Sequence, residues 1–485
     1  MTETTRRQFL TSLTGGAVVA TLSGRSRISC AAETAAGARK PNIIFILADD
    51  LGYGDVGCYG QKLIQTPNID NLAAEGVRFT QCYAGGTVCA PSRCCLMTGL
   101  HSGHGFVRGN APGYNEGRVL RPEDVTVGDI LKAAGYATGI VGKWGLGEPD
   151  TTGLPNKKGF DYWFGYLDQV HAHEYYTDYL WRNEEKVVLK GNLDGKQTEY
   201  SNDLFIAEAL DFIKRGKDKP FFLYYAGTLP HGKFQVPSLE PYADKPWPPT
   251  QKAYAAMVTR LDTYVGRIMA LLKELGLDEN TIVFFSSDNG PAAREGDWAM
   301  FNSAGPFRAK KGDLYEGGIR APMIVRWPGK IRPNTVSEQV WAFWDFLPLA
   351  AELAGAKAPS GIDGISMLPA LLKKPQQSHE FLYWEHHAGG FSQAARMGDW
   401  KGVRWGTKEP LELYDLKDDV GETKNVAAEH ADVVKKIETY LATARTESKA
   451  WQPREYRQPA KAGAKKAGAG KGAAKKAGKK KAATR

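Results

Sequence analysis

The 485-residue sequence contains no apolar run long enough to cross a membrane, which takes about 20 consecutive apolar residues. It has only six cysteines, five of them between residues 58 and 95, and no pair has zinc-finger spacing with histidines downstream. A disulfide framework spread over the chain is therefore excluded, while local disulfides and a chemical role for one cysteine both remain open. The composition, 42% hydrophobic and 24% charged, is that of a globular protein and excludes collagen-like and wholly disordered chains.

The body of the chain also lacks an excess of positive charge. The formal net charge is +9, but residues 460–485 alone contain nine Lys, one Arg and no acidic residue. Without the two ends, the segment 39–459 has a small net negative charge. A nucleic-acid-binding enzyme carries its positive charge on the folded body, so no nucleic-acid partner is indicated. The Lys/Ala/Gly tail, residues 459–485, has no core-forming side chains and is expected to be disordered.

Residues 1–38 have the pattern of an export signal. Arg6 and Arg7 precede a weakly apolar stretch from Leu10 to Leu22, and small residues follow at 31–38. The stretch is too short and too polar to span a membrane. We therefore expect a twin-arginine-type signal that directs the protein to the periplasm or to the cell exterior.

Apolar runs of strand length alternate with helical patterns over most of the chain. The runs are nearly continuous and rich in β-branched and aromatic residues, as in strands covered on both faces. Strands are expected at Asn42–Ala48, Ala137–Val141, Phe221–Ala226, Thr281–Ser287 and Met323–Trp327. Helices are expected at Thr126–Ala134, Asn202–Lys214 and Tyr254–Leu275. This alternation predicts an α/β fold over residues 39–375, with a large, mostly parallel sheet flanked by helices.

Residues 376–458 have a different pattern. Four short strand-like segments lie between residues 381 and 414 and are joined by turns, with no helix of crossover length between them. A helix is expected after them, at Ala431–Arg445. Strands that follow one another in this way pair antiparallel, so the segment predicts a smaller C-terminal antiparallel α+β domain.

Polar residues follow four of the expected strands at the point where each strand ends. They are Asp49 with Asp50, Lys143, His231, and Asp288 with Asn289. In an open α/β sheet, ligands bind beyond the carboxyl ends of the strands, so these side chains are expected to converge there. The three aspartates and the asparagine offer hard oxygen ligands without a cluster of histidines. Such a set favours Ca²⁺ or Mg²⁺ over zinc.

The segment Cys89–Gly99 reads Cys-Ala-Pro-Ser-Arg-Cys-Cys-Leu-Met-Thr-Gly. It resembles the sulfatase signature, Cys-x-Pro-Ser-Arg-x-x-Leu-x-Thr-Gly, at every fixed position. The resemblance extends from Pro41 to about Asn425 and includes the motifs Asp49-Asp50, Gly142-Lys143-Trp144, Ser287-Asp288-Asn289-Gly290, Lys311-Gly312 and Gly398-Asp399-Trp400-Lys401. The chain thus resembles the type I, formylglycine-dependent sulfatases of the alkaline-phosphatase-like superfamily, whose fold agrees with the expected sheet.

The resemblance implies an enzyme that hydrolyses sulfate monoesters. In the family the signature cysteine, Cys89 here, is oxidised to formylglycine by a separate formylglycine-generating enzyme. One hydroxyl of the hydrated aldehyde attacks sulfur and the second then expels sulfate, a route that an ordinary serine ester lacks. Matching positions imply one Ca²⁺ held by Asp49, Asp50, Cys89, Asp288 and Asn289. They imply catalytic roles for Cys89, Arg93, Lys143, His231 and Lys311.

The cationic side chains of this set have distinct implied roles. Arg93, Lys143 and Lys311 would neutralise the sulfate oxygens, and Arg93 would also position residue 89. Lys310 adjoins Lys311, and the following glycine selects Lys311 as the family residue. His231 would contact the sulfate or protonate the leaving oxygen.

One position departs from the family pattern. Many members read Lys-Trp-His-Leu-Gly, and that histidine is thought to be the base when sulfate is expelled, but this chain has Gly145 there. A histidine from elsewhere is therefore expected to complete the site, with His173 ahead of His171. Both lie in a polar and aromatic segment between the Lys143 strand and the next expected helix. His173 is thus a candidate base or substrate-binding residue.

Two further pairs of histidines offer alternatives. His101 and His104 lie just after the signature and are weaker candidates for the missing base. His386 and His387 follow a strand of the C-terminal domain, which borders the pocket in the family. By this resemblance, His387 is expected to bind substrate.

Two other functions remain open. A phosphonate or phosphate ester hydrolase of the same superfamily would use the same formylglycine, with a richer cationic or two-metal site. An inactive protein that binds sulfated glycans would have no need of Cys89. For an exported sulfatase, a sulfated saccharide is the expected substrate and small aryl sulfates are expected artificial ones. Neither the sugar nor the sulfate position follows from the sequence.

Overall fold

The computed structural model describes residues 39–110, 117–292 and 297–455. The expected export signal at 1–38 and the expected tail at 459–485 lie outside the described residues, and both stay predictions. Within the described part of the chain, no helix combines the length and the apolar character needed to cross a membrane.

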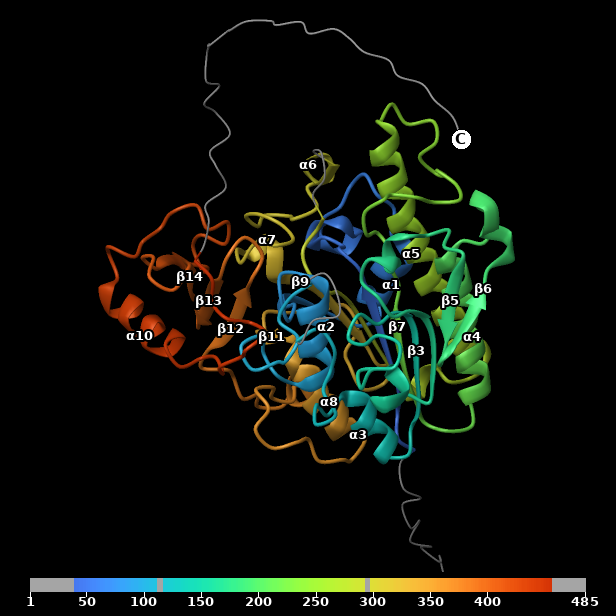
Figure 1. Ribbon diagram of the computed structural model, residues 1–485, viewed down its shortest axis with the longest axis horizontal. Coiled ribbons are helices and arrows are strands. Elements are labelled where there is room, and N and C mark those ends of the chain that lie inside the picture. The colour runs from blue at the N-terminus through green and yellow to red at the C-terminus, as the bar shows by residue number, and fades with distance from the viewer. Residues whose placement is uncertain (1–38, 111–116, 293–296, 456–485) are drawn as a thin grey trace, which may run out of the picture. The chain divides into compact units, whose positions relative to one another are not determined.

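Eleven strands form one large sheet (Figure 1). Their order is β10-β2-β9-β8-β1-β7-β3-β4-β5-β6, with β11 beside β2. The strands are β1 (Asn42–Ala48), β2 (Val77–Tyr83), β3 (Ala137–Lys143), β4 (Tyr162–Tyr166), β5 (Tyr179–Arg182), β6 (Glu185–Val188), β7 (Phe221–Ala226), β8 (Thr281–Ser287), β9 (Arg320–Arg326), β10 (Thr335–Ser337) and β11 (Trp341–Ala342). The central strands β8, β1, β7, β3 and β4 run parallel, whereas β9, β5 and β6 pair antiparallel with their neighbours. The predicted large, mostly parallel sheet is confirmed.

The central strands are buried on both faces. All seven residues of β1 are buried, and the strand is hydrogen bonded on both edges, to β7 and to β8. Because successive side chains of a strand point to opposite faces, Phe45 packs in one core while Ile44 and Ile46 pack in another. A continuous apolar strand of this kind needs cover on both faces, which the flanking helices provide.

Different helices contribute to the two cores. The helices are α1 (Pro67–Ala74), α2 (Cys89–Thr98), α3 (Val127–Ala133), α4 (Ser201–Gly216), α5 (Pro249–Glu274), α6 (Asp297–Phe301), α7 (Glu316–Ile319), α8 (Phe346–Leu353), α9 (Leu368–Leu371) and α10 (Ala431–Leu441). Apolar side chains of α2, α3 and α8 share the core of Phe45, and those of α1, α4 and α5 share the core of Ile44. The expected helix-flanked sheet is therefore confirmed, with α2 lying close to the ends of the central strands (Figure 1).

A smaller antiparallel sheet follows the large sheet along the chain (Figure 1). Its strands follow in sequence order and are β12 (Leu382–His386), β13 (Ser392–Met397), β14 (Trp400–Trp405) and β15 (Glu412–Asp415). Helix α10 packs Ile437 and Leu441 against one face, together with Leu413 of β15. This arrangement confirms the expected small antiparallel α+β part, while its boundary near residue 375 stays a prediction.

A buried cluster of charges joins the small sheet to the segment after α2. The Glu385 carboxylate on β12 accepts hydrogen bonds from Arg108 (3.2 Å), Arg445 (2.9 Å), the His387 ring (2.9 Å) and the Tyr383 hydroxyl (2.9 Å). Burial raises the pKa of Glu385, but the hydrogen bond from His387 and the charge of Arg108 outweigh burial, and the pKa is about 2. The carboxylate therefore stays ionised in the folded protein.

Replacing Glu385 with glutamine is expected to lower the free energy of unfolding by about 3 kcal/mol at neutral pH, because the buried Arg108 and the partly buried Arg445 lose their counter-charge. The folded pKa lies below the ordinary value of 4.5, so the stabilisation is present above pH 4.5 and is lost as the pH falls toward 2. Urea unfolding at several pH values should show the difference between the two proteins narrowing in acid. Glu429→Gln, which removes an exposed pair with Lys424, should cost less than about 1 kcal/mol. Equal losses for both variants would contradict the expectation.

Candidate active site

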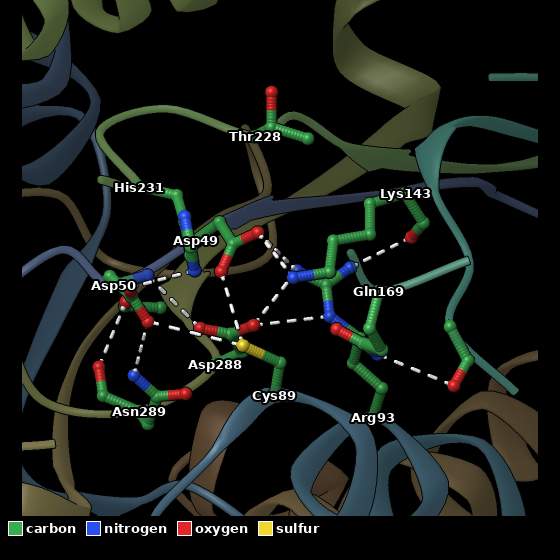
Figure 2. A network of polar contacts seen from close by, with 12 residues as sticks. Asp49, Asp50, Cys89, Arg93, Lys143, Gln169, Thr228, His231, Asp288 and Asn289 are labelled. Carbon is green, nitrogen blue, oxygen red and sulfur yellow. Dashed lines mark hydrogen bonds and ion pairs between the residues drawn. The ribbon is translucent and has the colours of Figure 1, made fainter. Parts of the chain in front are cut away.

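The site lies at the carboxyl ends of the central parallel strands (Figure 2). Asp49 and Asp50 follow β1, Asp288 and Asn289 follow β8, and Lys143 is the last residue of β3. These strands are close neighbours in the order β8-β1-β7-β3, which brings the side chains together although the sequence separates them widely. The backbone N–H of Asp50, for example, donates to Asp288 Oδ1 at 3.1 Å.

Cys89 is the first residue of α2 and faces the carboxylates (Figure 2). Its side chain is buried, and Sγ lies 3.4 Å from Asp49 Oδ1, 4.0 Å from Asp50 Oδ1 and 3.4 Å from Lys311 Nζ. Burial, followed by the Asp49 charge, raises the pKa of the thiol to about 12, although Lys143 and Lys311 oppose the shift. The unmodified thiol is therefore protonated at neutral pH.

Arg93 lies one helical turn after Cys89, so both side chains point to the same face of α2. Its guanidinium donates to Asp288 Oδ2 through Nε (3.1 Å) and Nη2 (2.8 Å), and to the backbone oxygen of Lys143 through Nη1 (2.8 Å). These contacts connect α2 to β8 and to β3. Arg93 thereby fixes the position of Cys89 between the strand ends.

Two lysines neutralise the first two carboxylates. Lys143 Nζ donates to Asp49 Oδ2 and Lys311 Nζ to Asp50 Oδ2, both at 2.8 Å. Burial raises the pKa of each aspartate, but the neighbouring positive groups, led by Lys143 at Asp49 and by Lys311 at Asp50, together outweigh burial, so both pKa values are lowered. Both aspartates are accordingly charged in the site.

Asp288 and Asn289 complete a set of oxygen ligands. Burial and then the Asp49 charge raise the pKa of Asp288 to about 6, against the charge of Arg93. Asn289 donates to Asp50 Oδ1 at 2.8 Å, while its own Oδ1 is buried and accepts no hydrogen bond within the described structure. Three carboxylates beside an unsatisfied amide oxygen are a donor set that suits a hard divalent cation.

Two histidines, His231 and His173, form a pair next to Asp50 and Lys311. The two rings stack with centroids 4.2 Å apart, and His231 Nε2 lies 3.3 Å from Asp50 Oδ2 and 3.3 Å from Lys311 Nζ. Burial, followed by the charges of His231 and Lys143, lowers the pKa of His173 to about 4. Burial also lowers the pKa of His231, against Asp50. The structure thus places His173 beside the predicted catalytic group, although its role stays a prediction.

His171 and His387 have structural partners away from this cluster. His171 Nε2 pairs with the Thr177 hydroxyl at 2.7 Å, and its ring packs against Tyr179. His387 pairs with Glu385, and its ring packs against Trp451. The neighbouring His386 is closer to the site, because its Nδ1 lies 2.7 Å from the hydroxyl of Thr87, two residues before Cys89. A substrate contact by His387 stays a prediction.

A second group with metal-binding residue types is formed by His101, His104 and Asp363. The His rings stack 4.2 Å apart, and His104 Nδ1 lies 2.9 Å from Asp363 Oδ1. His101 Nδ1 accepts a hydrogen bond from the Gly103 N–H, so the proton of neutral His101 is on Nε2, which faces Asp363 at 3.6 Å. If His101 Nε2 bound a metal, Nδ1 would usually donate a hydrogen bond to a neighbouring group. Here Nδ1 instead accepts a hydrogen bond from Gly103 N–H. The group is therefore a hydrogen-bonded cluster.

Gln169 is a polar residue of the site region that the sequence patterns do not indicate. Its Nε2 donates to the backbone oxygen of Gly145 at 3.3 Å, and Figure 2 shows it on the side of Cys89 opposite Asp50. The signal in the sequence was indirect: Gly145 replaces a larger family residue, which leaves space for another side chain. No sequence motif says which residue occupies that space.

The chain is similar to several known proteins. A family model described as Sulfatase matches residues 41–356, and one described as N-sulphoglucosamine sulphohydrolase, C-terminal, matches residues 308–447. An N-acetylgalactosamine-6-sulfatase of Canis lupus familiaris is 36% identical over 406 residues, which cover 78% of this chain and 74% of that protein. An N-acetylgalactosamine-6-O-sulfatase of Bacteroides thetaiotaomicron is 33% identical and covers 84% of this chain and 94% of its own. The crystal structure of Ps i-CgsB, 30% identical, matches with a TM-score of 0.74 over 86% of this chain and 95% of that one.

Proposed function

The chain belongs to the sulfatase family and is a sulfuric ester hydrolase, and we propose that it removes sulfate from saccharides through residue 89. The relatives named N-acetylgalactosamine-6-sulfatase support a sulfated sugar as the substrate. The single observation that carries the proposal is the position of Cys89, buried at the start of α2 within hydrogen-bond reach of Asp49 and Lys311.

The state of the thiol supports a modified residue 89. A cysteine attacks as its thiolate, and the pKa of Cys89, about 12, leaves almost none of that form at neutral pH. Converted to formylglycine, residue 89 would supply, as the hydrate, one hydroxyl to attack sulfur and a second to expel sulfate. The proposed partner in maturation is a formylglycine-generating enzyme. The export signal at 1–38 is proposed to take the protein to the periplasm or beyond.

The other side chains act by charge and by hydrogen bonding. Arg93, Lys143 and Lys311 provide three positive charges where negative charge develops on the sulfate oxygens. In a buried site this stabilisation is stronger than in water, because the surroundings screen it less. His231 Nε2, which lies next to Lys311, would hydrogen bond the ester oxygen as the alcohol leaves.

The donor set supports a divalent cation, Ca²⁺ by the family resemblance. Asp49, Asp50 and Asp288 would hold it together with the unsatisfied Asn289 Oδ1 and an oxygen of residue 89. The ion would supply positive charge that holds the carboxylates together and polarises the sulfate ester.

Removing the cation is expected to lower both turnover and thermal stability. Without the ion the three buried carboxylates are held together, within the described part of the chain, only by the charges of Lys143, Lys311 and Arg93. A ligand present at a hundredfold excess over its Kd stabilises the folded state by about 2.7 kcal/mol. The measurement is the melting temperature and the rate with 4-nitrophenyl sulfate before and after a chelator, then after added Ca²⁺. Asp399, an exposed carboxylate outside the site, provides the control: Asp399→Asn should respond to chelation and Ca²⁺ as the parent does. If the parent melted and turned over identically with and without chelator, the cation would not belong to the site.

Paired substrates separate the alternatives. The leading proposal expects fast hydrolysis of 4-nitrophenyl sulfate and slow hydrolysis of 4-nitrophenyl phosphate and of a phenylphosphonate ester. The reverse order would identify the phosphonate or phosphate ester hydrolase. Protein with residue 89 fully modified that bound sulfated glycans but turned over no ester would identify the inactive binding protein. A panel of galactose, glucose, N-acetylgalactosamine and N-acetylglucosamine 6-sulfates then tests the saccharide preference.

A further inference from the structure

Gln169 has a buried hydrogen-bond acceptor that is not satisfied within the described structure. The residue is 9% exposed, its Nε2 donates to Gly145 O, and its Oε1 has no hydrogen-bond partner among residues 39–110, 117–292 and 297–455. Leaving a buried acceptor unsatisfied costs on the order of 1–3 kcal/mol. A donor from a ligand or from water would remove that cost.

The backbone at Gly145 makes room for this amide. Gly145 has φ +77°, a conformation that favours glycine, and a Cβ there would lie 1.9 Å from Gln169 Nε2. No larger residue fits at 145 without moving Gln169. The hydrogen bond from Nε2 fixes the plane of the amide, and so it also fixes the direction of Oε1.

Gln169 lines a small pocket next to the reacting residue. The pocket is also lined by Ala90, Asn110, Arg118, Gly145 and Glu148, and it has room for about one hydroxyl or water oxygen. Ala90 directly follows Cys89, and its N–H donates to Asn110 Oδ1 at 2.9 Å. Figure 2 shows that Gln169 and the Asp50–Asn289 pair lie on opposite sides of Cys89. The pocket is thus adjacent to residue 89 but separate from the proposed cation ligands.

The chemistry of the orphaned atom selects the ligand. A carbonyl oxygen accepts hydrogen bonds and repels anionic oxygens, so neither a sulfate oxygen nor a carboxylate satisfies Oε1. A neutral O–H group does. A saccharide sulfate carries free hydroxyls on other carbons of its ring, in a 6-sulfate the nearest one on C4, whereas 4-nitrophenyl sulfate carries none.

We propose that Gln169 binds a hydroxyl group of the sulfated saccharide and thereby favours saccharide sulfates over aryl sulfates. This inference rests on the proposed function, because it takes the substrate to be the ester of a sugar. It adds a specificity-determining residue, Gln169, and the kind of group that this residue recognises.

The test compares two substrates in Gln169→Met, which keeps the side-chain length but removes both polar atoms. The probes are 4-nitrophenyl sulfate and the member of the 6-sulfate panel that the unaltered protein cleaves fastest. We expect the loss of kcat/KM on the saccharide to exceed the loss on the aryl sulfate by about 3- to 10-fold, the size of one neutral hydrogen bond. Gln197→Met, at an exposed position, should leave the ratio of the two substrates unchanged.

A second measurement uses the unaltered protein, so it does not depend on the folding of a variant. Among mono-deoxy analogues of the same saccharide sulfate, one should have a kcat/KM about 3- to 10-fold lower than that of the full saccharide. For this analogue, the loss of kcat/KM in Gln169→Met relative to the parent should be no larger than the loss for the aryl sulfate. Equal losses on both substrates would overturn the inference, because they would show that a water or residue 89 itself supplies the donor.

The remaining outcomes separate a failure of this inference from a failure of the proposed function. If the unaltered protein cleaves 4-nitrophenyl sulfate but no saccharide sulfate, the inference fails together with the saccharide part of the proposal. If it cleaves neither substrate with residue 89 modified, the proposed function itself fails. If it cleaves both and Gln169→Met changes neither rate, only the role of Gln169 is wrong.

Discussion

Replacing Cys89 with alanine is expected to abolish turnover of 4-nitrophenyl sulfate while the protein keeps its fold. Alanine has no thiol that can be exchanged for the aldehyde oxygen, so no hydrated aldehyde can form among Asp49, Asp50 and Lys311. The unaltered protein, made together with a formylglycine-generating enzyme, should show a mass loss in the peptide that contains residue 89. Its specific activity should rise in proportion to the modified fraction.

Cys94 provides the matched control for this prediction. It is also buried in α2, but its side chain belongs to the apolar core with Leu96 and Met97. Cys94→Ala should cost some stability through a small cavity and keep turnover near that of the unaltered protein. Equal activity from protein in which Cys89 is fully unmodified would show that the proposed mechanism is wrong.

Replacing His173 with alanine is expected to lower turnover by a factor on the order of 10²–10⁴, the usual range for a lost general acid or base. The ring stacks on His231 beside Asp50 and Lys311, and its pKa of about 4 keeps it neutral and able to accept a proton at pH 7. Steady-state rates with 4-nitrophenyl sulfate measure the effect, and rapid mixing separates release of the alcohol from release of sulfate. A slow second step in His173→Ala would mark the residue as the base in sulfate expulsion.

His171 lies two residues away and offers the control. Its ring is hydrogen bonded to the Thr177 hydroxyl and packs against Tyr166 and Tyr179. His171→Ala should therefore lower the melting temperature and leave the rate per folded molecule close to that of the parent. Near-normal turnover of His173→Ala would leave the base unidentified and would refute the assignment.

Three of the buried strands could be predicted residue by residue. The bounds of β3 and β9 differ from the expected ones, and β2 and β4, which are largely buried, were not expected. β1, β7 and β8 coincide with the expected segments because each is a continuous apolar run between polar or turn residues. β5 and β6 were missed because they have four residues each, with β5 only partly buried and β6 largely exposed, so they carry no long apolar run. Helix α2 was not expected as a helix either: its apolar and polar residues are all buried, which erases the amphipathic pattern.

The candidate site divides in a similar way. Strand ends identified Asp49, Asp50, Asp288 and Asn289, because parallel strands deliver their last residues to one edge. Lys311 could be identified only through the family resemblance, because it lies in a loop and the hydrophobic periodicity of a sequence does not predict the path of a loop. Gln169 was missed altogether, because only the folded structure shows that its side-chain amide fills the space beside Gly145.

The strand order has a consequence for the timing of synthesis. β1 is made early, yet one of its partners, β8, carries Asp288, which lies 238 residues beyond Asp50. At about 5–20 residues per second, a ribosome needs roughly 10–50 s to cover that distance. During this interval the chain has already produced Cys89, but Asp288 and, later still, Lys311, whose Nζ lies 3.4 Å from Cys89 Sγ, do not yet exist. Once β8 is in place the side chain is 1% exposed. On the proposed mechanism, an enzyme that oxidises Cys89 would have to reach the side chain before the sheet is complete. The fraction of active molecules would then depend on the rate of modification relative to the rate at which β8 is synthesised and added to the sheet.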